Sequence, residues 1–230
     1  MNITKWSLTA ALFLSGMANN AMNANPTDTA PASTIAKGID LAKLNQVVED
    51  IRANPSHGRI EFRAVGQSEE MIYHSTARVG PFMAGGQELG QTRQYVLHVG
   101  LPAELQSDAQ HPVDRIEPVE LALAGLSDCV IGTVAVHALV NGIQVDHVAT
   151  TIRAPLNLQV FMGIGGLDQR DQIFGSISIE VEIEGPNLTE PQRRFLSEQI
   201  KRSPVFNLVA LAHDMDTTLT IRVANPASTM

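Results

Sequence analysis

A chain of 230 residues is long enough for one large domain or two small ones, and its 44% apolar and 17% charged residues favour a packed core over wholesale disorder. The formal net charge is -8. Non-specific binding to nucleic acid or to an anionic membrane requires a basic surface, so the composition argues against both. Aromatic residues make up only 4% of the chain, so the composition does not suggest a base-stacking or sugar-stacking platform.

The first 24 residues have the pattern of a secretory signal peptide. A lysine precedes a mostly apolar run over 6–18, and small and polar residues follow it. That run is too short for an ordinary membrane span. Ala21 and Ala24 are the candidate last residues of the signal. We therefore expect a periplasmic or secreted protein with a linker over 25–37; the alternative is a disordered or expression-related N-terminus on a cytoplasmic protein.

Apolar periodicity predicts one helix followed by strands in the first half of the chain. In chain order, the expected elements are a helix over 38–55, a strand over 59–65, a turn over 66–68, a partner strand over 69–79, a glycine-rich loop over 80–91, a strand over 93–101 and a polar loop over 101–118.

A long central helix is expected next, from Pro118 to about residue 141. Proline suits the first turn of a helix, and the Asn-Gly pair at 141–142 ends it. The helix is apolar nearly all round, which predicts burial on all sides. Glu120, Asp128 and His137 argue against a membrane span.

The remaining segments alternate again between strand and helix patterns. A strand is expected over 143–160, a loop over 161–172, a strand over 173–186, helices over 188–202 and 203–211, and a closing strand over 216–224. This order predicts an α+β fold with a mainly antiparallel sheet, in one domain over 38–224 with a tail over 225–230.

Cys129, the only cysteine of the chain, lies in the central helix. A single cysteine excludes an intrachain disulfide and a multi-cysteine metal site, and no cofactor or metal is expected. Gly125, Gly132 and Thr133 share its helix face, and the glycines would let another helix, a backbone segment or a substrate approach closely. Two interpretations stay open at this point: a reactive thiol, or a thiol that fills the core.

Reactivity requires the thiolate, which a helix start at Ser203 or an arginine such as Arg63 or Arg78 would favour if it folded near the thiol. His137 lies two turns beyond Cys129, roughly 12 Å along the helix axis, which is too far for a direct base. We expect His137 to be a satisfied core histidine.

Two segments resemble the OsmC/Ohr superfamily. PVELALAGLSDCVIGTVAVHALVNGI at 118–143 resembles the cysteine helix of that family, and KRSPVFNLV at 201–209 resembles its second segment. The helix expected over 38–55 and RIEFRAV at 59–65 resemble the longer OsmC-like subgroup. The resemblance covers roughly 38–224.

This resemblance implies a fold of antiparallel sheets around a long buried central helix, in an obligate, intertwined homodimer whose central helices pack back to back. It also implies thiol-dependent reduction of organic hydroperoxides in the response to oxidative stress. In that chemistry a peroxidatic cysteine attacks the O–O bond, an arginine and a glutamate activate it, and a second cysteine closes a disulfide.

The family residues carry over only in part. Cys129 matches the peroxidatic cysteine, and Glu120 matches the glutamate of the OsmC-like branch. Val119 stands where the peroxidase branch has its glutamate, Ser203 stands where the second cysteine would be, and Asp128 replaces the usual small residue before the cysteine. With a single cysteine, the catalytic cycle that remains compatible with the resemblance runs through a sulfenic acid and an external thiol reductant.

The sequence therefore supports two leading hypotheses. In the first, a homodimer reduces a small hydroperoxide with Cys129, helped by Glu120. In the second, a non-catalytic homodimer binds a small apolar ligand at the subunit interface. In a third hypothesis, Cys129 has no chemical role and only packs in the core. No nucleic-acid or membrane partner is expected. The expected pocket residues are Ser203, Gly125, Gly132, Thr133, Pro204 and Phe206.

Overall fold

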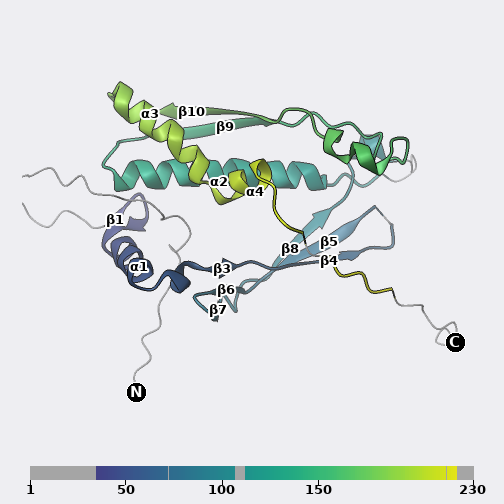
Figure 1. Cartoon of the computed structure of the whole chain (residues 1–230), viewed down its shortest axis with the longest axis horizontal. Coiled ribbons are helices and arrows are strands. Elements are labelled where there is room, and N and C mark those ends of the chain that lie inside the picture. Colours follow the sequence, from purple (N-terminus) through teal and green to yellow (C-terminus); the bar gives the residue numbers. More distant parts are fainter. Residues whose placement is uncertain (1–34, 72, 107–111, 216, 222–230) are drawn as a thin grey trace, which may run out of the picture.

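A computed structural model describes residues 35–71, 73–106, 112–215 and 217–221. The signal peptide predicted over 1–24 and the tail predicted over 225–230 lie outside these residues. Figure 1 shows the described chain as two halves, with the N-terminal helix and sheets below the long central helix and a second sheet above it.

Within the described residues, the N-terminal half holds one α-helix and eight short strands. Its elements are β1 (Ile35–Ala36), β2 (Ile39–Asp40), α1 (Leu41–Ala53), η1 (Pro55–Gly58), β3 (Ile60–Glu61), β4 (Ala64–Ser68), β5 (Ser75–Val79), β6 (Phe82–Ala84), β7 (Gln87–Leu89) and β8 (Tyr95–Val99). They form the antiparallel sheets β1-β2, β3-β6-β7 and β4-β5-β8.

The C-terminal half is built on the central helix. Its elements are η2 (Ala103–Leu105), α2 (Pro118–Val140), β9 (His147–Arg153), η3 (Leu167–Gln172), β10 (Ser178–Glu184), α3 (Glu190–Gln199), η4 (Ile200–Arg202) and α4 (Pro204–Ala210). Strands β9 and β10 pair antiparallel along their whole length. The α+β class and the antiparallel pairing expected from the sequence are confirmed.

The first strands differ from their predicted positions. The strand predicted over 59–65 is divided into β3 and β4, and the turn predicted over 66–68 is wrong because those residues pair with β5. The chain turns later, where the Glu69 N–H donates to the His74 carbonyl at 2.9 Å. The loop predicted over 80–91 contains the β6-β7 hairpin, whose two turn glycines have φ of 55° and 78°, as a tight two-residue hairpin turn requires.

Two predicted strands of the second half also differ. The strand expected over 143–160 is limited to β9, because the residues after Arg153 leave the pairing with β10. The closing strand expected over 216–224 is not formed in its described part, 217–221. Leu219 and Ile221, which carry its apolar alternation, are 80% and 78% exposed. A strand pattern needs a sheet edge to pair with, and no described segment of the same chain pairs with this one.

Local signals fix both ends of α2. Glu117 caps its N-terminus, and the Glu120 carboxylate accepts the Glu117 N–H at 3.0 Å to complete a capping box. Gly142, with φ of 64°, follows its C-terminus in the left-handed conformation that glycine favours. The central helix predicted over 118–141 is confirmed.

One face of α2 forms the centre of the main hydrophobic core. Leu126, Val130 and Val134 are at most 1% exposed and pack with Leu196 of α3 and with the inner faces of β9 and β10. Burial on all sides, which the sequence predicted, is wrong for the single chain. The opposite face of α2 is open to solvent, because no described element covers it: Ala124, Gly125, Asp128 and Ala135 are exposed.

An ion pair joins the β4-β5 turn to the segment that leads into α2. Both terminal nitrogens of Arg115 donate to the two carboxylate oxygens of Glu69 at 2.8 Å, and Thr76 Oγ1 donates to the same carboxylate at 2.7 Å. The hydrogen bond from Arg115, followed by that from Thr76, lowers the pKa of Glu69 from its ordinary 4.5 to about 2. A parallel bridge between Val99 and Ile116 lies beside the pair. We call this arrangement the Glu69–Arg115 clamp.

The clamp predicts a pH-dependent effect of Glu69→Gln. The carboxylate is favoured in the folded state, so its contribution to the free energy of unfolding is fully present above pH 4.5 and is lost as the pH falls towards 2. We expect Glu69→Gln to lower the urea midpoint at pH 7 and to lose most of that difference at pH 3.

The matched control is Glu70→Gln, which removes the neighbouring exposed carboxylate. It should leave the urea midpoint close to that of the unmodified protein at both pH values. A difference between Glu69→Gln and the unmodified protein that stays constant from pH 7 to pH 3 would contradict the assigned role of the clamp.

Candidate active site

Cys129 lies at the middle of α2, at the border between its buried and its exposed face. Its thiol is half-buried. Gly125 is exposed and Gly132 is half-buried, and a Cβ atom placed on either glycine would meet no heavy atom within 4 Å. The two predicted pocket glycines therefore leave open space on the helix face next to the thiol.

Thr133 holds the helix backbone at the cysteine rather than lining that open space. Its side chain is fully buried, and its hydroxyl donates to the Cys129 carbonyl at 2.7 Å. Ser127, two positions before the cysteine, shares a 2.5 Å hydrogen bond with Thr150 of β9. The Ser127–Thr150 bond joins α2 to β9 just before the thiol, whereas the Thr133 bond stays within α2.

The predicted pocket residues after α3 come from the start of α4, which packs on α2 (Figure 1). Ser203 is fully buried, and its Oγ accepts the Phe206 N–H at 3.2 Å as the cap of α4. Phe206 is half-buried and packs against the core cluster, whereas Pro204 is exposed. The Ser203 hydroxyl is thus a structural cap in this chain.

The predicted helper groups are not brought to Cys129 within one chain. Glu120 is exposed in the capping box of α2, nine positions before Cys129, which is about 13 Å along the helix axis. Arg63 lies between β3 and β4 and Arg78 lies in β5, and both are exposed. Their assistance to the thiol stays a prediction.

His137 is buried, but the expectation that its hydrogen bonds are satisfied is wrong. The side chain is 3% exposed, and its Nε2 atom has no hydrogen-bond partner among the described residues. Gln199, at the end of α3, and Ser203, before α4, are buried polar residues as well. Burial, followed by the positive charge of Arg202, lowers the pKa of His137 below its ordinary 6.5.

Sequence reasoning missed the Glu69–Arg115 clamp, because its two partners are 46 positions apart and neither belongs to a recognisable motif. A turn residue that pairs with a residue before the next helix gives no local sequence signal. Within the described residues, no group of three or more histidine, cysteine, aspartate or glutamate side chains is arranged to hold a metal ion.

The neutral state of His137 predicts acid sensitivity of the fold. Since the folded protein disfavours the protonated imidazole, the unfolded state takes up the proton first, and stability falls as the pH drops below 6.5. We expect His137→Leu to gain stability over the unmodified protein between pH 7 and pH 5, measured by urea unfolding. His147→Leu, at an exposed position on β9, is the control and should show no such gain. Parallel pH profiles for the His137→Leu and unmodified proteins would disprove this role.

The comparisons with known proteins agree with the two segments that carry Cys129 and Ser203. The family model described as OsmC-like protein matches residues 111–219. No curated protein matches the chain.

Three solved structures illustrate the similarity. The OsmC-like protein from Mycoplasma pneumoniae is 17% identical with a TM-score of 0.45, over 65% of this chain and 87% of that one. The organic hydroperoxide resistance protein OsmC from Legionella pneumophila is 15% identical with a TM-score of 0.37, over 64% and 88%. The organic hydroperoxide resistance protein OhrB of Bacillus subtilis is 11% identical with a TM-score of 0.36, over 64% and 89%.

The similarity to the OsmC-like family rests on the family model and on the two sequence motifs inside residues 111–219. The TM-scores of the solved structures do not contribute to it. The matched segment contains all of α2 with Cys129 and all of α4 with its cap Ser203. Residues 111–219 therefore match the OsmC-like family.

Proposed function

We propose that this OsmC-like protein is a homodimer in which Cys129 reduces organic hydroperoxides. The observation that carries the proposal is the placement of the only cysteine: half-buried on α2, beside open space over Gly125 and Gly132, within the matched segment 111–219. The sequence resemblance gives this position to the peroxidatic cysteine. Reactive cysteines are partly exposed, whereas structural cysteines are enclosed and inert.

The chemistry begins with the thiolate of Cys129. Its sulfur attacks the terminal oxygen of the hydroperoxide, the O–O bond breaks, and the alcohol leaves after taking up a proton. The cysteine is oxidised to a sulfenic acid and the peroxide is reduced. The apolar side chain of Val136 shares the helix face of Cys129, so an organic hydroperoxide suits this surface better than hydrogen peroxide.

Recovery of the thiol requires an external reductant, because no second cysteine exists in the chain. Ser203, which stands at the matching position, is buried and used as a helix cap. One external thiol condenses with the sulfenic acid, releasing water and forming a mixed disulfide. A second thiol then releases Cys129 and leaves with the first as a disulfide. With export predicted from residues 1–24, this reductant acts in the periplasm or outside the cell.

The homodimer covers the exposed face of α2. That face combines the small residues Ala124 and Ala135 with Leu121 and Leu139, all on the side of the helix away from the core. Small residues permit the close approach of a second helix. A second copy of the chain supplies such a helix with the same surface, as a two-fold symmetric interface requires.

The proposed dimer predicts that Ala124→Arg weakens self-association. A charged side chain buried at a helix–helix contact without a partner costs several kcal/mol, so we expect the dimer dissociation constant to rise about 100-fold or more. Sedimentation velocity over a concentration series measures this. Thr151→Arg, on the exposed outer face of β9, is the control and should remain a dimer. A monomeric unmodified protein would contradict the proposal.

The proposed activity predicts that the purified protein consumes cumene hydroperoxide in the presence of dithiothreitol and that Cys129→Ser abolishes the consumption above background. Replacement of sulfur by oxygen removes the nucleophile but keeps the side-chain shape. The rate with hydrogen peroxide should be at least about 10-fold lower, because apolar contacts with the organic substrate are missing.

The control variant for this assay is Ser197→Ala, at an exposed position of α3, which should retain the full rate. Equal rates for Cys129→Ser and the unmodified protein would contradict thiol catalysis. That outcome would favour the second hypothesis, a non-catalytic homodimer that binds a small apolar ligand.

A further inference from the structure

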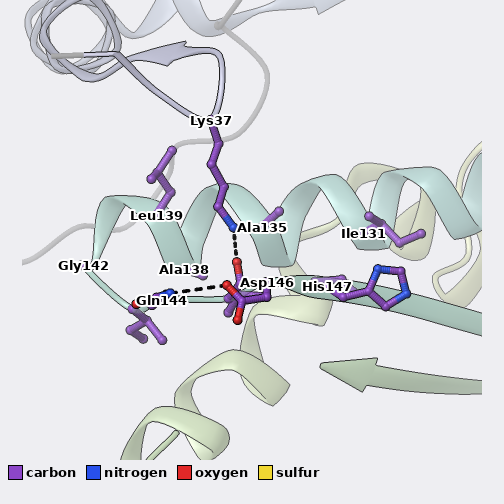
Figure 2. A pocket seen from close by; sticks show the side chains of 12 residues that line it. Lys37, Ile131, Ala135, Ala138, Leu139, Gly142, Gln144, Asp146 and His147 are labelled. Atoms are coloured by element: carbon purple, nitrogen blue, oxygen red, sulfur yellow. Dashed lines mark hydrogen bonds between the residues drawn. The ribbon is translucent and has the colours of Figure 1, made fainter. Parts of the chain in front are cut away.

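The hollow beside the C-terminal half of α2 is part of the proposed dimer contact. It lies between α2, the start of β9 and the turn between β1 and β2, where the Lys37 Nζ donates to the carbonyl of Val145 (Figure 2). Ala135 and Leu139 line it from α2, and both lie on the face that a second copy covers in the proposed dimer. The hollow is therefore not an independent ligand site.

A second candidate site is the loop between β9 and β10. Four large apolar side chains between positions 161 and 167 project into solvent: Phe161 is 76% exposed, Met162 64%, Ile164 76% and Leu167 80%. We call these four residues the apolar loop tip. Large apolar side chains that gather on a surface mark contacts with proteins or with membranes.

The backbone of the loop tip is hydrogen-bonded within the loop. The N–H groups of Met162 and Ile164 donate to the carbonyls of Leu158 and Gln159, each at 2.8 Å. Gly163 takes the φ of 71° that this turn requires. Unpaired backbone groups are costly in an apolar medium, and these internal bonds reduce their number.

The base of the loop is held to the strands that it connects. The Asn157 N–H donates to the Ile173 carbonyl at 2.8 Å, and the Gly175 N–H donates to the Pro155 carbonyl at 2.9 Å. Figure 1 shows the loop and η3 beyond the ends of β9 and β10. Because these strands pack on the core face of α2, the loop is not part of the dimer contact proposed on the opposite face.

The charges around the loop favour a zwitterionic lipid surface. No charged residue occurs over 154–167. The base carries exposed charges of both signs in equal number, from Arg153, Arg170, Asp168 and Asp171. Such a base matches a head group that carries both a phosphate and an ammonium, whereas the net charge of -8 opposes an anionic surface.

The side chains of the loop tip also favour lipid over a protein partner. They carry no charge and no N–H or O–H group that would orient a protein partner through hydrogen bonds. Protein–protein interfaces normally combine an apolar centre with such bonds. Lipid acyl chains require none of them.

We infer that the apolar loop tip inserts into a zwitterionic phospholipid surface and holds the protein reversibly at the membrane. Its four side chains enter the boundary between head groups and acyl chains, and the charges at the base stay among the head groups. This proposal replaces the sequence-based expectation of no membrane partner, which considered anionic surfaces and membrane-spanning helices. It does not depend on the proposed peroxide reduction, because no step of it uses Cys129.

A fluorescent label on a single introduced cysteine tests the inference in the full-length protein. In a Cys129→Ser background, Ile164→Cys places a nitrobenzoxadiazole label in the loop tip, and Ser197→Cys places it at an exposed position of α3 as the matched control. With phosphatidylcholine vesicles, we expect a blue shift and quenching by spin-labelled lipid at position 164 and neither at position 197. The label reports on the loop itself, so binding through residues 1–24 does not produce this difference.

Partitioning onto the vesicles should depend on the other tip side chains. Phe161→Ser combined with Leu167→Ser should weaken the partitioning of the protein labelled at position 164 by at least about 10-fold, because two large apolar contacts are lost. Leu105→Ser is the matched control, since it removes a leucine that is 60% exposed outside the loop. It should leave the partitioning unchanged.

Three results would overturn the inference. The first is a label at position 164 that does not respond to vesicles, or that responds no more than the label at position 197. The second is a blue shift at position 164 without vesicles that grows with protein concentration, which would assign the loop tip to a contact between copies of the chain. The third is binding to phosphatidylglycerol vesicles alone that salt removes, which would assign the contact to charge. Since these variants lack Cys129, a failure of the peroxide assay is a separate result.

Discussion

The packing of one face of α2 against β9, β10, α3 and α4 is the constraint on which both candidate sites depend. Burial of a Leu or Val side chain contributes about 1.5–3 kcal/mol, and Leu126, Val130 and Val134 on that face are at most 1% exposed. Once those residues are buried, the helical period fixes the direction in which each remaining residue of α2 points. Cys129 is placed at the border of the core, and the stripe through Ala124 and Asp128 is placed in solvent.

The two halves of the chain are joined by polar contacts rather than by a shared core. The Glu69–Arg115 clamp and the bridge between Val99 and Ile116 tie the β4-β5-β8 sheet to the segment before α2. The exposed face of α2 and the N-terminal sheets in Figure 1 are therefore separate surfaces of the single chain. This arrangement agrees with the proposal that a second copy covers the open side of α2.

The sequence predicted the helices well and the strands less well, for a physical reason. Helix ends carry local signals, such as the proline at the start of α2 and the Ser203-Pro204 start of α4, so α1, α2, α3 and α4 were found near their true limits. Strand limits depend on distant partners, which explains the errors at β4 and in the strand expected over 216–224. The contacts of Arg115 and Lys37 span 46 and 108 positions, and no local pattern predicts them.

The central claim is that Cys129 is an accessible thiol that reacts with organic hydroperoxides, and the pH dependence of its alkylation tests this claim most directly. Iodoacetamide would be applied to the purified protein from pH 5 to pH 9, before and after one equivalent of cumene hydroperoxide, with intact mass as the readout. The account predicts that the unoxidised thiol is readily alkylated and that the peroxide blocks this alkylation. Slow alkylation at every pH, unchanged by the peroxide, would contradict it and assign Cys129 to packing alone.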